Sequence, residues 1–441
     1  MLMNKQRSFN HQLSRVRSTI PSQISHNPWP HVLIIESISI VITVIHPRVY
    51  LRQAPPTIGY TMSPYTIIYV IIAYKLLTTL ILPWWIQRGS AKWNLRLKTF
   101  TANHDGKVIT AGEKKKGKQQ QQHHLLFIAV PSSGAGRAMD LYDECIQELQ
   151  KREENFTIEV HVTKSSDDVK NLVLSRDIDH VVSKYYGIIV LGGDSSITEL
   201  IQAPLGRHGG RWMYPPILHL PGGSTNLLSK ELHGRKSHKE ILRQFSADKV
   251  RRAGVIKLSS TDGDDDNDDG SSIIYATHVA FHGIGRHMLV EAEQHRHGMY
   301  SVFGTPALMS IILKTIFSPP NKDETPYFAL LIASTTNFAG GMDSGFGMDL
   351  FDDKLVMIHA KQYNGPFRYI KELMVNMGTG ELARQYFTST LPEGVEVKIG
   401  EKFTFQDHDF HFILDGTSTV SKMGRSVTVE SVQDSIPYFV I

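Results

Sequence analysis

Cysteine is almost absent from this chain of 441 residues, in which Cys145 is the single example. One thiol can form neither an intramolecular disulfide nor a zinc site built from cysteines, which indicates a domain in a reducing compartment. Cys145 lies within Ala138–Leu149, a stretch that we predict to be a helix. We therefore expect a buried structural thiol rather than a nucleophile.

A strong charge imbalance is also absent, because 47 Lys and Arg residues face 43 Asp and Glu residues, for a formal net charge of +4. No region joins a basic face to a recognisable nucleic-acid-binding module, so we expect no nucleic-acid partner. The content of 41% hydrophobic and 20% charged residues fits a globular protein. It excludes a wholly disordered chain and a polytopic transporter.

Acidic residues are missing from the first 35 positions, which carry several basic residues and serines. This composition fits either an organelle transit peptide or a basic cytosolic tail. Further on, Tyr65–Trp85 is apolar and long enough, as a helix, to cross the ~30 Å hydrocarbon core of a bilayer. We predict that it associates with a membrane, and the basic residues beyond it keep the following chain in the cytosol. A buried helix of a soluble domain is the alternative.

Three units of apolar strand, glycine turn and helix follow one another between residues 125 and 232. Leu125–Val130 precedes PSSGAGRA, Gly187–Leu191 precedes GGDSSITEL, and Ile217–Leu220 precedes PGGSTN. Such turns aim backbone N–H groups at phosphates, and ligands of open α/β sheets bind at the carboxyl ends of the strands. A single glycine turn is weak evidence, but three in a row favour a nucleotide-binding α/β domain.

In order and spacing these turns resemble three motifs of the diacylglycerol kinase catalytic domain family, NPxSGxGxA, GGDGTxxE and PxGTxN. The sphingosine and ceramide kinase branch shares them. The resemblance implies an ATP-dependent lipid kinase that uses Mg²⁺, with Asp194 as the key carboxylate. It further implies that the nucleotide site includes Ser133, Gly134, Gly136, Thr163, Gly192, Gly193, Glu199, Ser224 and Asn226. It identifies no protein ligand for the metal.

The second half of the chain contains many short β-rich segments separated by turn residues, from Ile273–Phe281 to Val427–Val432, and this pattern predicts a β-sandwich. The resemblance continues here, in AEQHRHGMY at 292–300, where Arg296 is a candidate phosphate ligand. It also includes Asp415 and Gly416, in a motif that reads Asp-Gly-Glu in the family.

We accordingly expect three regions. Residues 1–122 comprise the basic tail, the membrane-associating segment 65–85 and a low-complexity linker, KKKGKQQQQ at 114–122. Residues 123–250 form the α/β catalytic domain of the NAD kinase/diacylglycerol kinase type. Residues 251–441 form the β-sandwich domain, with a solvated acidic loop at 261–270. The sequence does not specify an oligomeric state.

Two departures from the family pattern concern catalysis. Ser195 stands where the family has glycine, so a Cβ occupies a position whose backbone often needs glycine's freedom. Thr417 replaces a glutamate that the family is thought to use as a base or in binding the metal–nucleotide complex, and threonine can do neither at neutral pH. A pseudokinase that binds lipid or nucleotide at a membrane is therefore the alternative to an active lipid kinase. An NAD kinase fits less well, because the membrane segment and the stretch around Arg296 suit a lipid kinase.

Overall fold

The computed structural model describes residues 82–441 except for gaps at 112–122, 153–155, 166–167, 171, 173–177, 247, 261–271, 295–310, 312, 318–328, 338–342, 362–364, 407–408 and 418–419. The linker, the acidic loop and Arg296 lie outside the described residues. So does the apolar segment 65–85, apart from the backbone of residues 82–85, which begins helix α5 (Leu82–His104). No helix within the described part of the chain is both long enough and apolar enough to span a membrane.

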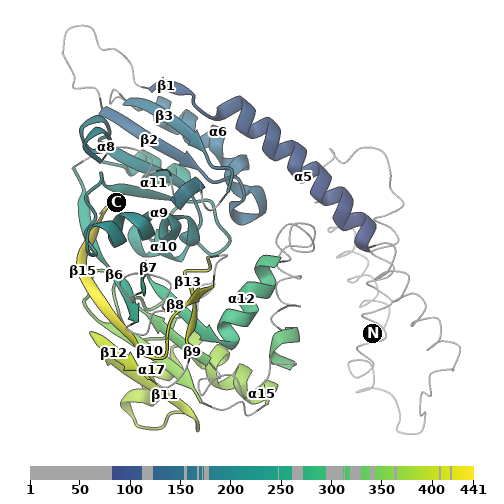
Figure 1. Ribbon diagram of the computed structural model, residues 1–441, viewed down its shortest axis with the longest axis vertical. Coiled ribbons are helices and arrows are strands. Elements are labelled where there is room, and N and C mark those ends of the chain that lie inside the picture. The colour runs from purple at the N-terminus through teal and green to yellow at the C-terminus, as the bar shows by residue number, and fades with distance from the viewer. Residues whose placement is uncertain are drawn as a thin grey trace, which may run out of the picture. The chain divides into compact units, whose positions relative to one another are not determined.

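The larger of two sheets is mixed (Figure 1). Its strands in spatial order are β1 (Val108–Ala111), β3 (Phe156–Val162), β2 (His123–Ala129), β4 (Gly187–Gly192), β5 (Ile217–Pro221), β15 (Val427–Phe439), β6 (Val250–Ser260) and β7 (Ser272–Ala276), with β12 (Lys402–Phe405) paired to β15. From β3 to β5 neighbouring strands are parallel, and the end of β15 pairs with β5 in parallel. The pairs β1–β3, β15–β6, β6–β7 and β12–β15 are antiparallel.

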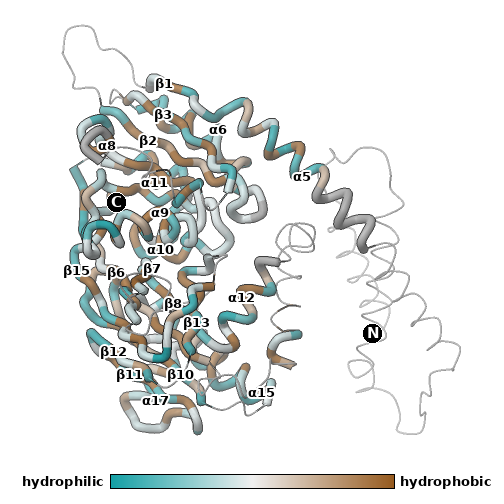
Figure 2. The backbone as a smooth tube through the Cα atoms, in the orientation of Figure 1, coloured by the Kyte–Doolittle hydropathy of each residue, from teal (hydrophilic) through white to brown (hydrophobic). Residues whose placement is uncertain are grey.

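Helices cover both faces of the parallel strands. Two of them, α6 (Arg137–Gln150) and α11 (His238–Gln244), pack on one face, while α8 (Ile178–Lys184), α9 (Asp194–Arg207) and α10 (Leu227–His233) pack on the other. A parallel strand covered on both faces is apolar where it is buried, and β2 is buried and apolar from Leu125 to Ala129, in brown in Figure 2. Cys145 lies buried in α6, and burial raises the pKa of its thiol to about 12, which confirms the expected structural thiol.

The smaller sheet is antiparallel throughout. Its spatial order is β11 (Val395–Gly400), β10 (Leu355–Ala360), β9 (Ala329–Ala333), β8 (Val279–Gly283), β13 (His411–Leu414) and β14 (Ser421–Lys422). One face packs against helices α12 (Ile284–Gln294), α15 (Pro366–Tyr369), η6 (Ile370–Val375, a π-helix), α16 (Asn376–Gly378) and α17 (Glu381–Phe387). The other face shares a core with β6, β7, β12 and β15. An α/β domain followed by a β-sandwich, the fold class expected from the sequence, is therefore what the chain forms.

The path of the chain between the two sheets is less simple than the sequence indicated. Strand β6 begins at Val250, where we placed a domain boundary, and β15 returns to the parallel strands after a bulge between Val432 and Ile436. The segment Ile273–Phe281, which we expected to be one strand, splits at Thr277 and His278 into β7 in one sheet and β8 in the other. One end of β6 and one end of β15 thus pack in the core beside the parallel strands, and the other end of each packs in the core of the sandwich.

Candidate active site

The candidate site lies at the carboxyl ends of the parallel strands. The chain leaves β2 to form β3 on one side and later β4 on the other, so the strand order reverses between β2 and β4. Open α/β sheets bind ligands outside such a reversal. PSSGAGRA follows β2, GGDSSITEL begins at the end of β4, and PGGSTN begins at the end of β5. The sheet therefore brings together the three turns that the sequence singled out.

The three turns touch through their backbones at glycine positions. A Cβ added at Gly223 would lie 2.5 Å from Cα of Gly193, and one added at Gly134 would lie 2.6 Å from the carbonyl oxygen of Gly222. Gly134 also has a φ of +57°, which side chains rarely tolerate. A Cβ added at Gly192 would lie 2.8 Å from Oγ of Ser196. Glycine is thus required at positions 134 and 223 because backbone meets backbone there, and at position 192 because the Ser196 side chain lies there.

Two hydroxyl groups hold the first two turns in register. The backbone N–H of Gly193 donates to Oγ of Ser133 at 3.2 Å, and the Ser133 and Ser196 hydroxyls are 3.3 Å apart. The third turn is bonded to the second, because the Gly222 N–H donates to the Gly192 carbonyl at 2.8 Å. Ser195, next to Ser196, lies in the right-handed first turn of α9. The steric concern raised by its Cβ is therefore wrong, because helical backbone accepts any side chain.

Asp194 is buried, and its carboxylate is fully engaged by the neighbouring turn. It accepts hydrogen bonds from Thr225 Oγ1 at 3.0 Å, from the Leu227 N–H at 2.9 Å and from the Leu228 N–H at 3.0 Å. Leu227 begins α10, so the carboxylate satisfies N–H groups that the first turn of a helix leaves without partners. Asp194 thus fixes the third glycine turn to the second.

Asn226 shapes its own turn. Its amide donates to the Gly223 carbonyl at 2.8 Å and accepts from the Gly223 N–H at 2.6 Å, while its backbone takes the left-handed conformation, with φ of +52°. Asparagine is one of the few non-glycine residues that adopt this conformation readily. Beside it, Ser224 and Thr225 are exposed on the turn. The exposed part of the third turn therefore consists of hydroxyl-bearing residues.

Asp415 is the second buried carboxylate of the site, and it joins the two sheets. It accepts from the N–H groups of Thr277, His278 and Val279 at 2.6, 3.1 and 2.7 Å, and from Oγ1 of Thr277 at 2.9 Å. The hydroxyl of Thr198, on α9, also donates to it. These bonds explain why the predicted strand 273–281 splits, because the backbone N–H groups at its middle are turned to this carboxylate.

Two buried imidazoles lie near these carboxylates, and we did not identify them from the sequence. Nδ1 of His278 lies 3.0 Å from Oδ1 of Asp415. His219, on β5, places Nε2 3.3 Å from the Gly192 carbonyl. Burial lowers the pKa of His219, and the nearby Asp194 carboxylate opposes that shift. His219 within the otherwise apolar strand ILHLP was the one sequence signal, because burial of an imidazole costs free energy unless it has a hydrogen-bond partner.

The remaining predicted residues have separate positions. Thr163 is buried at the end of β3, where its N–H donates to the Ala129 carbonyl at 3.0 Å. Gly136 faces away from the other glycine turns, since a Cβ there would lie 2.5 Å from the Trp93 ring of α5. Glu199 is half-buried on α9, outside the contacts of Asp194 described above. Gly416, with φ of +72°, forms the turn after Asp415.

The place of the three turns in the sheet, at the carboxyl edge of the strands, is the one at which open α/β folds bind ligands. Ser224 is exposed on the third turn. Within the described residues no three His, Cys, Asp or Glu side chains are arranged to hold a metal ion. That finding is compatible with Mg²⁺, which keeps several waters and binds largely through substrate phosphates.

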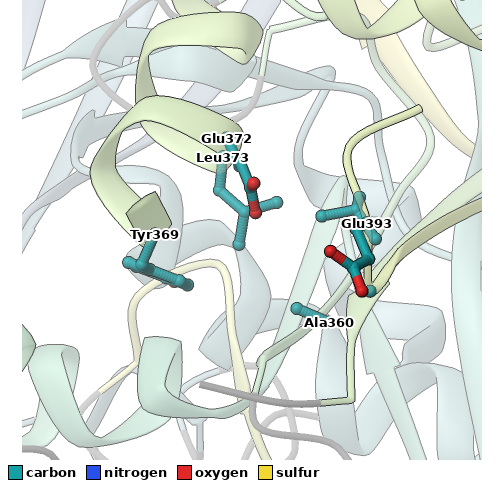
Figure 3. A pocket seen from close by; sticks show the side chains of 7 residues that line it. Ala360, Tyr369, Glu372, Leu373 and Glu393 are labelled. Atoms are coloured by element: carbon teal, nitrogen blue, oxygen red, sulfur yellow. The ribbon is translucent and has the colours of Figure 1, made fainter. Parts of the chain in front are cut away.

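A separate small pocket lies in the second domain (Figure 3). Its volume of about 10 Å³ is close to that of one water molecule. Glu372 comes from the π-helix and Glu393 from the segment before β11, and Arg368 pairs with both. The pocket is therefore too small for a nucleotide.

Comparisons with known proteins agree with this geometry. Residues 124–258 match the diacylglycerol kinase catalytic domain. Two Staphylococcus aureus proteins, from strains MSSA476 and MW2 and both named "Putative lipid kinase", are 25% identical to this chain over 158 residues, or 36% of this chain and 43% of theirs. The chain thus matches less than half the length of these relatives.

A crystal structure from Bacillus anthracis, described as a "putative diacylglycerol kinase", covers 75% of this chain and 98% of its own, with a TM-score of 0.50 and 16% identity. At that identity the likeness concerns the fold alone. The segment that carries the three glycine turns thus matches the diacylglycerol kinase catalytic domain family, which confirms the resemblance that the turns indicated.

Proposed function

We propose that the protein is an ATP-dependent lipid kinase that transfers the γ-phosphoryl group to a lipid hydroxyl. The observation that carries the proposal is the contact of three glycine turns at the carboxyl edge of the parallel sheet. The match of residues 124–258 to the diacylglycerol kinase catalytic domain supports it. A sphingoid base, ceramide and diacylglycerol are the candidate substrates.

In this proposal the chain contributes mainly positioning. Phosphoryl transfer needs the reacting oxygens in line and the phosphate charge stabilised, rather than covalent help from the protein. Gly134, Gly192, Gly193 and Ser224 line the phosphate site, and Asp194 keeps the second and third turns in their relative position. Counter-charge on the phosphates would come from Mg²⁺ that binds with the nucleotide. We also propose that segment 65–85 brings the domain to the membrane that holds its substrate.

The experiment is incubation of the purified full chain with labelled ATP, Mg²⁺ and vesicles that contain diacylglycerol, ceramide or sphingosine in turn. Transfer of label to one lipid class, above the level of an Asp194→Asn variant, is the expected result. If no lipid is labelled above that variant, the protein is not an active kinase of these substrates.

A pseudokinase is the second candidate, and two observations favour it. Thr417 stands at the position of the family's glutamate, and the carboxylates of Asp194 and Asp415 are both taken up by hydrogen bonds within the protein. Binding of ATP and Mg²⁺ without turnover would support this candidate. A Thr417→Glu variant distinguishes the two, because a large gain in activity would show that the native site lacks a carboxylate there.

A further inference from the structure

Glu231 lies close to the candidate site and was not among the residues that the sequence indicated. It is on α10, four residues after Leu227, whose N–H donates to Asp194. Residues four apart share one side of a helix and are separated by ~6 Å along its axis. Glu231 therefore lies one turn beyond the point at which Asp194 holds α10.

A hydrogen bond directs the Glu231 carboxylate toward the second sheet. Nδ2 of Asn337 donates to its Oε1 at 2.8 Å. Asn337 follows β9, and Ser334 in the same turn donates its N–H to the His278 carbonyl at 3.0 Å. His278 also lies close enough to Glu231 to affect its pKa, and Nδ1 of His278 is 3.0 Å from Asp415, so His278 lies between Glu231 and the residue that begins the Asp-Gly-Thr turn.

The electrostatic state of Glu231 differs from that of the chain's structural carboxylates. Burial raises its pKa, while the Asn337 amide and the nearby His278 oppose the shift. Glu148, by contrast, binds Arg243 at 3.0 Å and Lys151 at 2.7 Å, and these cations lower its pKa to about 2. A half-buried carboxylate whose pKa is raised and whose partner is a neutral amide is a better proton acceptor than one that is held by cations.

Neither of the two motif carboxylates is suited to that task. Asp194 is 4% exposed and Asp415 is 6% exposed, and each accepts several hydrogen bonds that hold backbone segments together. A proton on either carboxylate would occupy an oxygen that now accepts hydrogen bonds from these buried segments and would weaken those bonds. Within the described residues, the Glu231 carboxylate accepts its hydrogen bond from the Asn337 side chain and from no backbone N–H group.

We propose that Glu231 is the general base for the lipid hydroxyl, at a site where position 417 provides no carboxylate. The proposal rests on the kinase function proposed above. As the hydroxyl oxygen forms its bond to the γ-phosphorus, the bond from that phosphorus to the β–γ bridging oxygen breaks and ADP leaves. The hydroxyl proton passes to the Glu231 carboxylate, which then releases it to solvent.

The test compares Glu231→Gln with wild type, in the full chain and with the lipid that wild type labels. The glutamine keeps an oxygen that accepts from Asn337 but cannot take a proton. We expect kcat to fall by about 10²–10⁴-fold, with the Kd for ATP and the melting temperature unchanged. Wild-type kcat should decline as the pH falls through the pKa of Glu231, and this decline should vanish in the variant.

Two further variants separate a base from a merely structural residue. Asn337→Ala removes a hydrogen bond that lowers the pKa of Glu231, so the acidic decline should move to higher pH. Glu393→Gln removes an 85% exposed carboxylate elsewhere and should leave kcat unchanged. A Glu231→Gln variant whose kcat and pH profile equal those of wild type would overturn the assignment. A wild-type chain that labels no lipid would overturn the proposed function and this assignment together.

Discussion

The Asp194 carboxylate accepts hydrogen bonds from the backbone N–H groups of Leu227 and Leu228, at 2.9 and 3.0 Å, and so holds the start of α10 against the glycine turn that follows β4. A residue that the motif resemblance identifies as catalytic thus also has a structural function. The two functions predict different results when the carboxylate is altered.

Asp194→Asn should lower the free energy of unfolding as well as activity. The amide nitrogen of asparagine cannot accept a hydrogen bond, so at least one buried N–H would lose its partner, at a cost of about 1–3 kcal/mol. Urea unfolding of the variant and of wild type measures the difference. Equal unfolding midpoints with equal slopes would contradict the structural function.

Gly223→Ala should disrupt nucleotide binding, because its Cβ would lie 2.5 Å from Cα of Gly193 and backbone cannot move aside easily. Gly206→Ala is the matched control. A Cβ there has no atom within 4 Å and stands in helix α9, where alanine is favoured over glycine. Calorimetric titration with ATP and Mg²⁺ should show weaker binding for Gly223→Ala and wild-type binding for the control. Equal affinity in all three proteins would refute the close approach of the turns.

Gly136→Ala should loosen α5, since the added Cβ would lie 2.5 Å from the Trp93 ring and the φ of Gly136 is +95°. Trp93→Ala in the same chain removes the steric conflict but not the backbone strain, so the double variant should recover stability only in part. Amide hydrogen exchange in residues 91–104 reports the change. Unaltered exchange in Gly136→Ala would mean that the helix does not depend on this contact.

Stability should fall in mild acid, and His282 should account for part of the loss. This imidazole is 1% exposed, and burial lowers its pKa from 6.5 to about 4. Between those two values the unfolded chain binds a proton that the folded chain does not, so the free energy of unfolding decreases as the pH falls. The slope from one such group is at most about 1.4 kcal/mol per pH unit. Unfolding by urea between pH 7 and pH 4.5 should show a shallower decline for His282→Gln, and parallel declines would exclude this histidine as a cause.

Local signals in the sequence determined the elements around the site. Apolar runs followed by glycine-containing turns predicted β2, β4 and β5 and the turns after them. Such signals are readable because strand burial and turn conformation depend on a few neighbouring residues. The match to the diacylglycerol kinase catalytic domain confirms the family resemblance that these turns carried. The nucleotide-binding functions of individual residues stay predictions.

Only the tertiary structure decided which partner each polar residue has. Asp194 bonds to N–H groups 33 and 34 residues away, and Asp415 bonds to Thr198 across 217 residues. The return of β15 to β5 and the bond between Glu231 and Asn337 likewise join distant segments. No periodicity or turn signal encodes such pairs, because they arise when segments far apart in the sequence pack together and their buried polar groups must find hydrogen-bond partners.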